Sequence, residues 1–246
     1  MLPKSWNDIS VSQYKELRQL GKTPADSITE RYIDTILTLT DIPLEDVEEM
    51  SMDSLIEIVD KIRFIKTEPS TKYAKKLGDY QVLPFNKLTW GAFIDLEFYI
   101  SKDYIEHIEI VTGVLLRKVM PDTWGVTQYE PYNYHPKQRG EELLNVPITG
   151  IYGIVQEYVN YRNDLINNKY AELFNRSLDD DEEEELDGQD LAEYNKRKGQ
   201  ERAFNKWSYE SITYDLAKED VTKMNDVLDL PLIYILNILS MRHEMR

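Results

Sequence analysis

The 246-residue sequence predicts a mainly α-helical fold, with a helical body, a small β-hairpin and a helical C-terminal appendage. Apolar residues recur every three or four positions over most of the chain, which is the period of an amphipathic helix. One short stretch around Gly78-Asp79 has instead the turn signal of a hairpin. Hydrophobic residues make up 41% of the sequence and aromatic residues 11%, which is enough to build a core.

The N-terminal quarter of the chain has the clearest helical pattern. Ser10 and Gln13 have the spacing of a capping box at the start of a helix, which Gly21 is expected to end. Thr23-Pro24 is expected to open a second helix, and Ser51 to cap a third one. The apolar stripes of the second and third helices are Ile28, Tyr32, Ile36 and Leu39, and Leu55, Ile58, Val59, Ile62 and Ile65.

The middle of the chain is expected to combine the hairpin with further helices. Gly78-Asp79 lies between 72–77 and 80–83, and a glycine at the first turn position is typical of a type II′ hairpin. Thr89 is expected to cap a helix, and another helix is expected over about 104–119.

Charge suggests how the chain is divided. It has 29 Lys and Arg against 45 Asp and Glu, a net charge of −16, and the run DDDEEEELD at 179–187 holds half of that excess. Such a run is expected to be a solvated loop or an electrostatic docking strip for a basic partner. The expected parts are an N-terminal helical unit (1–67), a hairpin with a helical body (68–178), an acidic loop (179–190) and a C-terminal helical segment (191–246).

The sequence contains no recognisable catalytic, cofactor-binding or metal-binding motif. It has no cysteine, which excludes disulfides and thiol chemistry, and it has no Gly-x-Ser-x-Gly element. His107, His135 and His243 fall on three different expected elements, so they form no zinc signature. A charge of −16 would repel a phosphate backbone, and no apolar stretch reaches the roughly 18 residues of a membrane span. We therefore expect a non-enzymatic protein that binds neither nucleic acid nor a membrane.

Two segments are candidates for binding a partner protein. The helix expected after Pro231 carries Leu232, Ile235, Leu236 and Leu239, which could dock onto the chain's own body or into a groove of another protein. The loop at 120–136 contains Trp124 and Tyr132, whose rings could form an exposed stacking platform or cover the core.

Three short segments together share the pattern of one known family. They are Leu2-Pro3-Lys4-Ser5-Trp6-Asn7-Asp8-Ile9-Ser10 with Gln13-Tyr14, then 80–97 with Leu88-Thr89-Trp90-Gly91-Ala92-Phe93-Ile94-Asp95-Leu96-Glu97, then 216–221 and 227–232 with Asn237. The chain thereby resembles a family of tailed-bacteriophage proteins, found in phages of Bacteroidetes and described as tail assembly chaperones or minor virion proteins.

The resemblance implies a non-enzymatic role in phage assembly. The first expectation is a tail assembly chaperone, which holds a tail component such as the tape-measure protein before it is incorporated. The alternative is a structural protein of the virion, in the portal–tail region or the tail. Either role implies other phage proteins as partners, is compatible with an oligomer, and places the protein in the host cytoplasm during assembly or in the virion.

Overall fold

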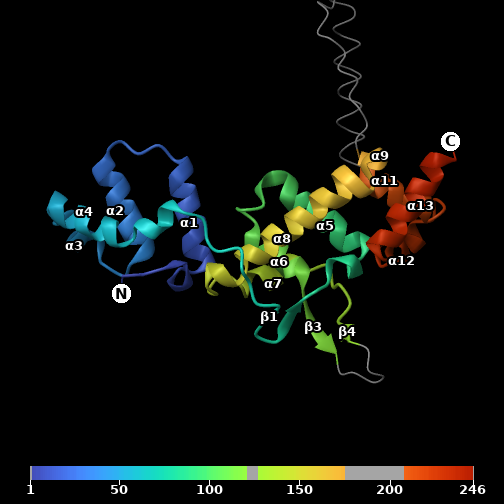
Figure 1. The fold of residues 1–246 in the computed structure, drawn as a ribbon, viewed down its shortest axis with the longest axis horizontal. Coiled ribbons are helices and arrows are strands. Elements are labelled where there is room, and N and C mark those ends of the chain that lie inside the picture. Colours follow the sequence, from blue (N-terminus) through green and yellow to red (C-terminus); the bar gives the residue numbers. More distant parts are fainter. Residues whose placement is uncertain (1, 121–126, 175–207, 246) are drawn as a thin grey trace, which may run out of the picture. The chain divides into compact units, whose positions relative to one another are not determined.

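The computed structural model describes residues 2–120, 127–174 and 208–245, and it confirms the mainly α-helical fold (Figure 1). The chain forms two compact units, each made of segments that are far apart in the sequence. Unit 1 comprises Met1–Leu83 and Leu96–Asn160, and unit 2 comprises Pro84–Asp95 and Tyr161–Arg246. The units therefore do not follow the linear order of expected parts. The expected acidic loop at 179–190 and the start of the C-terminal segment lie outside the described residues.

Unit 1 begins with a group of helices that the sequence largely predicts. They are η1 (Trp6–Asp8), α1 (Val11–Lys22), α2 (Ile28–Leu39), α3 (Leu44–Glu48), α4 (Met52–Lys61) and η2 (Arg63–Lys66). The capping box of Ser10 and Gln13 is present, and the Ser51 hydroxyl accepts the Ser54 amide as a helix cap. Ile36, Val47 and Leu55 form the buried centre of α2, α3 and α4.

The structure corrects two expected helix ends. Gly21 does not end α1, because the helix continues to Lys22, where the Thr23 amide bonds back to the carbonyls of the last turn. Helix α2 starts after Ser27, whose hydroxyl accepts a hydrogen bond from the Glu30 amide. Pro24 therefore lies in the connection and not in the first turn of α2.

The predicted hairpin is part of a larger antiparallel sheet. Strands β1 (Lys76–Leu77), β2 (Tyr80–Val82), β3 (Leu116–Met120) and β4 (Gln128–Tyr129) follow one another in the order β1-β2-β3-β4. Gly78 has a φ of +57° at the first turn position, as the predicted turn requires. The helix expected over 104–119 ends at Leu115, because Leu116 instead pairs with Val82 and continues as β3.

The remaining helices of unit 1 follow strand β2 in the sequence. They are α5 (Trp90–Asp103), which starts in unit 2, then α6 (Ile108–Leu115), α7 (Pro136–Glu141), η4 (Ile148–Gly150) and α8 (Tyr152–Asp164), which ends in unit 2. Helices α6 and α7 approach closely through two glycines. A Cβ atom at Gly113 would lie 2.9 Å from the Pro136 carbonyl oxygen, and one at Gly140 would lie 3.2 Å from the Ile110 Cα.

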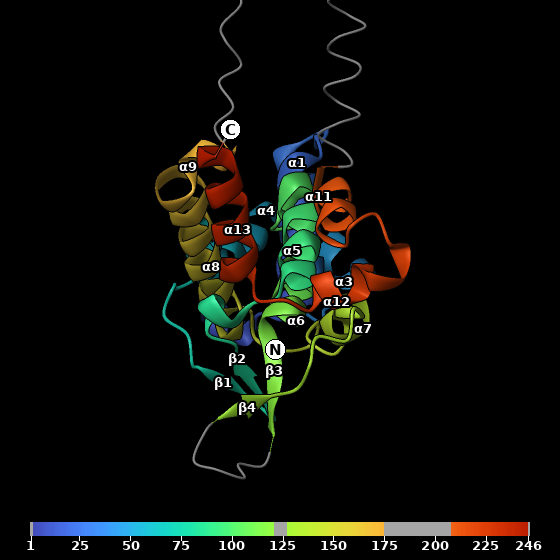
Figure 2. The same cartoon turned by 90° about the vertical axis from the view of Figure 1, so that its right-hand side faces the viewer.

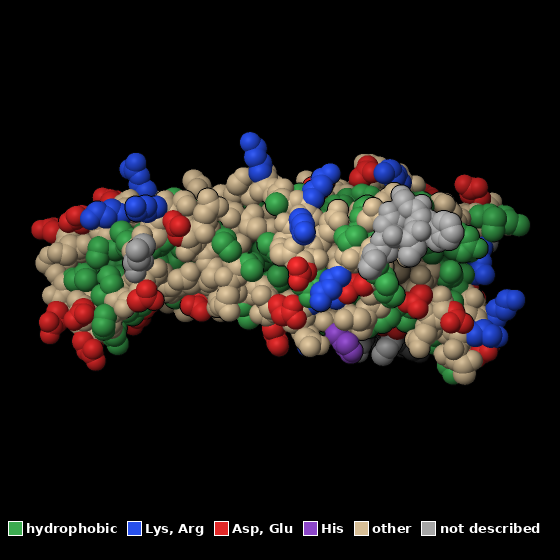
Figure 3. Space-filling model, turned by 90° about the horizontal axis from the view of Figure 1, so that it is seen from below, with side chains coloured by type: hydrophobic (Ala, Val, Ile, Leu, Met, Phe, Trp, Pro, Cys, Tyr) green, Lys and Arg blue, Asp and Glu red, His purple; other side chains and the backbone are tan. Residues whose placement is uncertain are grey.

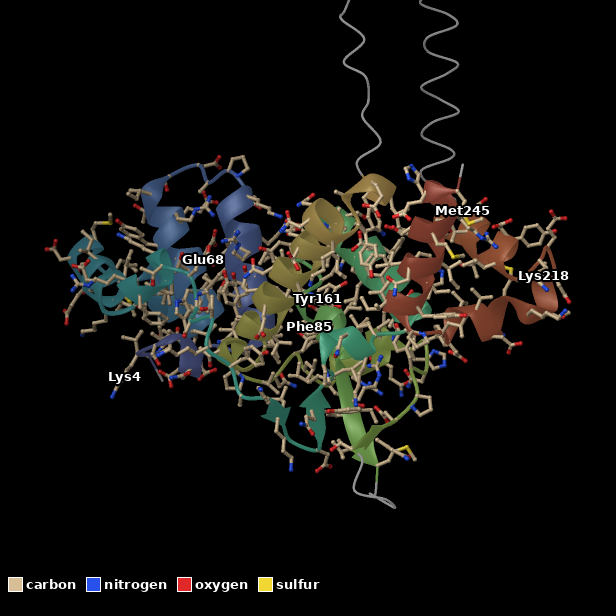
Figure 4. The ribbon with its side chains drawn as sticks, turned by 45° about the vertical axis from the view of Figure 1, so that its right-hand side comes forward. Lys4, Glu68, Phe85, Tyr161, Lys218 and Met245 are labelled. Carbon is tan, nitrogen blue, oxygen red and sulfur yellow. The ribbon has the colours of Figure 1, made fainter. Side chains whose placement is uncertain are left out.

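Unit 2 is built around the start of α5 and the C-terminal helices. Its other elements are η3 (Phe85–Lys87), the π-helical turn η5 (Leu165–Lys169), α9 (Ala171–Phe174), α11 (Ser208–Leu216), η6 (Val221–Lys223), α12 (Met224–Leu228) and α13 (Leu232–Glu244). The last helix, expected after Pro231, is confirmed, and it lies beside α9 (Figure 2). The rings of Phe85 and Tyr161 lie 5.4 Å apart between their centroids (Figure 4).

Each unit contains the same local arrangement, which we call the bridge motif. In unit 1, an isolated antiparallel bridge joins Ser10, at the start of α1, to Pro147, which leads into η4 and α8. In unit 2, the equivalent bridge joins Thr89, at the start of α5, to Pro231, at the start of α13. In both units, the amides beside the bridge donate to carbonyls of the opposite segment. In unit 1, Val11 donates to Val146 at 3.0 Å and Ile148 to Ile9 at 2.9 Å. In unit 2, Trp90 donates to Leu230 and Leu232 to Leu88, both at 2.8 Å.

The two bridge motifs also have similar sequences. Both Ser10 and Thr89 follow a short 3-10 helix that begins with an aromatic residue, Trp6 or Phe85. Each proline is the second-last residue of a matching run, Glu142-Leu143-Leu144-Asn145-Val146-Pro147-Ile148 and Asp226-Val227-Leu228-Asp229-Leu230-Pro231-Leu232. In each motif, a Ser or Thr cap and a proline fix where two helices begin.

Candidate functional site

The side chains of α13 that the sequence singles out for binding a partner face the interior of unit 2. Leu232, Ile235 and Leu236 are buried, with at most 1% of each residue exposed, and Leu239 is half-buried. Helix α13 therefore docks onto its own unit through this stripe, which was one of the two alternatives that the sequence left open.

Polar contacts on both sides hold α13 in this position. The Tyr170 hydroxyl donates to Asn237 Oδ1 at 2.7 Å, and burial raises the pKa of this tyrosine. The Ser240 hydroxyl donates to Glu172 on α9, and this hydrogen bond lowers the pKa of the Glu172 carboxyl group. An ion pair joins Arg242 to Asp215 on α11. These contacts fix which face of α13 is left toward the solvent.

The opposite face of α13 exposes a second row of large apolar side chains, which we call the outer stripe. It consists of Tyr234 and Met241 on α13 and of Met245, the C-cap residue directly after the helix; they are 54%, 53% and 79% exposed. Their spacing of seven and four residues places them on one face of a helix, with the half-buried Ile238 between the first two. The sequence pattern showed that this helix is apolar around much of its circumference. The structure divides that surface into a buried stripe and an exposed one.

The outer stripe has the chemistry of a helix that docks into a groove. Anchors at i, i+4, i+7 and i+11 are typical of amphipathic helices bound in apolar grooves. Methionine is flexible and polarizable, so Met241 and Met245 can adapt to a partner's surface. Tyr234 adds a large ring with a polar end, which suits a contact at the edge of an interface. Two residues of this stripe, Tyr234 and Met245, were missed in the sequence, although their spacing is readable there.

The Tyr- and Trp-rich loop contributes a buried ring rather than a platform in the part that the structure describes. Tyr132 is 7% exposed, and its ring packs against the Arg117 guanidinium group, 4.7 Å from the ring centroid. Trp124 lies outside the described residues. Of the two alternatives for this loop, Tyr132 adopts the one in which a ring covers the interior.

Beneath Tyr132 lies a pair of buried arginines that the sequence did not reveal. Arg117 is 2% exposed and donates to the carbonyls of Val114 and Leu116, at 2.6 and 2.7 Å. Arg139 is 8% exposed and lies 2.8 Å from a carboxylate oxygen of Glu130. Burial, together with the neighbouring Arg139, lowers the pKa of Arg117 to about 10. Arg139, on α7, also donates to the Leu116 carbonyl at 2.6 Å, which ties α7 to β3 and gives the pair a structural role.

The described residues offer neither a metal site nor a membrane span. Nowhere in 2–120, 127–174 and 208–245 do three His, Asp or Glu side chains gather as metal ligands would. Within the same ranges, no helix has both the length and the apolar character needed to cross a bilayer.

Comparison of the chain with protein-family models, with curated proteins and with solved structures finds no significant match. A function must therefore be argued from the chain's own residues.

Proposed function

We propose that this chain is a non-enzymatic assembly protein of a tailed bacteriophage, a tail assembly chaperone that holds a tail component before its incorporation. The observation that carries the proposal is the outer stripe, three large exposed apolar side chains on α13 and its C-cap residue, on a helix whose other face is anchored in unit 2. An anchored helix loses little conformational freedom on binding, so more of the contact energy is available for holding a client.

The segments that carry the family resemblance support the proposal in a second way. Residues 2–10 form one side of the bridge motif in unit 1, and residues 88–97 and 227–232 form both sides of the one in unit 2, so these segments lie at the starts of α1, α5 and α13. These segments supply helix caps and buried apolar residues, which maintain a scaffold and not a reaction centre.

Co-expression of the chain with the tape-measure protein of the same phage tests the proposal. We expect the two proteins to copurify, and we expect Met241→Lys and Met245→Lys together to remove the complex, since two charges would be buried in the interface. Ser211→Lys is the matched control, because it adds a charge at an exposed position of α11 outside the outer stripe. A complex that survives the methionine substitutions, that is also lost in the control, or that does not form with the unchanged chain would count against the proposal.

Mass spectrometry of purified particles separates the chaperone from the alternative role. A transient chaperone should be absent from finished virions. A fixed copy number in the particle would favour a structural protein of the portal–tail region or tail, with the outer stripe making a permanent contact.

A further inference from the structure

A cavity of about 500 Å³ opens between the N-terminal helices of unit 1. Its walls come from η1, from α1, from α2 and from the segment that begins with η2 and ends at Glu68. The volume lies within the range of about 300–1,000 Å³ that is usual for ligand-binding clefts. No residue of α13 lines this cavity, so it is independent of the proposed client-binding surface.

One part of the cavity lining, which we call its floor, is apolar and partly exposed. Trp6, Leu17, Leu20 and Ile65 line it as half-buried side chains. The Trp6 ring is held in place, because its indole N–H donates to the Thr67 carbonyl at 3.1 Å and its ring packs edge-on against Tyr14 and Phe64. A fixed apolar floor can accept an apolar side chain of a ligand without reorganising.

The charged residues around the cavity are mostly cationic, although the chain as a whole carries a net charge of −16. Four basic residues line it, Arg18, Lys22, Arg31 and Lys66, against the single acidic residue Glu68. The neighbouring stretch 41–60 contains eight acidic residues and no basic one. Figure 3 shows acidic side chains among hydrophobic ones at the end of unit 1 that α2, α3 and α4 form. Two of these cations have acidic partners: Lys22 pairs with Asp103 and Glu106, at 2.7 and 2.6 Å, and Arg18 pairs with Glu68. The excess positive charge at the cavity therefore comes from Arg31 and Lys66, beside an acidic surface.

The cationic side chains are positioned by contacts that leave donors available. Arg18 Nη1 lies 3.0 Å from Glu68, which also accepts the hydroxyls of Tyr14 and Tyr152, each at 3.2 Å. Glu68, labelled in Figure 4, thereby fixes one wall of the cavity. Arg31 donates to the carbonyls of Leu20 and Thr23 at the end of α1. In the part of the chain that the structure describes, Lys66 has no acidic partner.

We infer that this cavity binds an acidic peptide segment of a partner protein, with one apolar side chain on the floor and a carboxylate at Lys66 and Arg18. The cavity is open to solvent, since the Arg18 and Glu68 side chains are 43% and 57% exposed, and an extended chain can therefore continue beyond it. A short peptide that reaches Lys66 and Arg18 is attracted to them, because charges more than about 8–10 Å away are largely screened at physiological salt. A nucleic acid would extend over the acidic surface and be repelled.

Fluorescence anisotropy with the full chain tests this inference. The probe is a labelled six-residue peptide of alternating glutamate and leucine, and its matched control alternates glutamine and leucine. We expect saturable binding of the acidic peptide and at least fivefold weaker binding of the glutamine peptide, since the carboxylates supply the pairing with Lys66 and Arg18. Equal binding of the two peptides, or no saturation up to about 1 mM, would overturn the inference.

Two pairs of variants locate the binding. Lys66→Glu should weaken binding of the acidic peptide about tenfold by converting attraction into repulsion, whereas Lys137→Glu, an equal charge change on α7, should alter it less than twofold. Gly21 lines the cavity, and a Cβ there would meet nothing within 4 Å, so Gly21→Leu should occupy part of the space without disturbing α1. Gly21→Leu should weaken binding at least fivefold relative to Gly21→Ala. Equal affinities within either pair would show that the peptide binds elsewhere and would overturn the assignment.

Discussion

The indole N–H of Trp90 donates a 2.9 Å hydrogen bond to the hydroxyl of Thr213, and both side chains are buried. The same hydroxyl donates at 2.7 Å to the Tyr209 carbonyl, one turn earlier in α11. The rings of Phe93 and Tyr209 pack on the indole, with centroid separations of 5.7 and 5.6 Å. One threonine hydroxyl therefore satisfies a buried donor of α5 and ties it to α11 within unit 2.

Thr213→Val should destabilise unit 2 by about 1–3 kcal/mol. Valine fills nearly the same volume, so the loss comes from leaving the buried indole N–H without an acceptor. Urea denaturation followed by near-ultraviolet circular dichroism measures it, and Ser211→Ala, at an exposed position of α11, should change stability by no more than about 0.5 kcal/mol. If the hydrogen bond is the cause, Trp90→Phe will cost less in the valine background than in the unchanged chain.

Gly153→Ala should be among the most destabilising single-methyl changes in unit 1. A Cβ at this position of α8 would lie 2.2 Å from the Thr71 carbonyl oxygen, and a backbone atom cannot move away without shifting the segment before β1. Overpacking of this kind costs typically about 1–3 kcal/mol, which exceeds the helix propensity gained on replacing glycine by alanine. Thermal denaturation measures the change.

The same substitution at Gly21 is the matched comparison, and it should have the opposite sign. Gly21 is also inside a helix, but a Cβ there has open space around it. Gly21→Ala should therefore stabilise the chain by up to about 1 kcal/mol through helix propensity alone. Two substitutions with effects of the same sign would show that the contact with Thr71 does not decide the outcome.

The features that the sequence predicts correctly depend on interactions within a few residues. The caps at Ser10, Ser51 and Thr89 each bond an amide three residues ahead, so the local pattern is sufficient to place them. Gly78 takes its positive φ inside a two-residue turn. Each of these groups has its partner within three residues along the chain.

The features that the sequence does not reveal depend on distant pairing. Residues 116–120 have the apolar spacing of a helix, but Leu116 pairs with Val82, which no local pattern indicates. The division into two units could not be predicted for the same reason, because Thr89 and Pro231, which are paired in unit 2, lie far apart in the sequence. For α13, the pattern identified an apolar helix but could not say which face is buried, since the anchoring groups Glu172 and Asp215 lie on other helices.

The equivalence of the two bridge motifs leads to a prediction about their caps. Ser10→Ala and Thr89→Ala should each lower the free energy of unfolding by about 0.5–2 kcal/mol, because each hydroxyl accepts an amide at a helix start, from Gln13 at 3.2 Å and from Ala92 at 3.3 Å. The two caps share no hydrogen-bond partner, so their effects should add. Hydrogen exchange measured along the chain should show faster exchange in the first turn of α1 or of α5, according to the variant.

Conservative replacements distinguish capping from side-chain size in this experiment. Ser10→Asp and Thr89→Ser keep an oxygen that can accept the amide, so most of the stability should be retained. If these variants are as unstable as the alanine variants, the hydroxyls do not act as caps.

Alkaline pH should destabilise the chain through two tyrosines whose pKa values are raised in the folded state. Burial, with the nearby Glu68 carboxylate, raises the pKa of Tyr152 to about 12, and burial with a hydrogen bond to Glu157 raises the pKa of Tyr73 to about 12. Below pH 10 these tyrosines keep their protons in both the folded and the unfolded state. Between about pH 10 and 12 the unfolded state loses protons first, so the free energy of unfolding falls as the pH rises. Tyr152→Phe should flatten this fall by at most about 1.4 kcal/mol per pH unit, as measured by urea denaturation at several pH values. An unchanged slope in the phenylalanine variant would mean that Tyr152 ionises equally easily in both states.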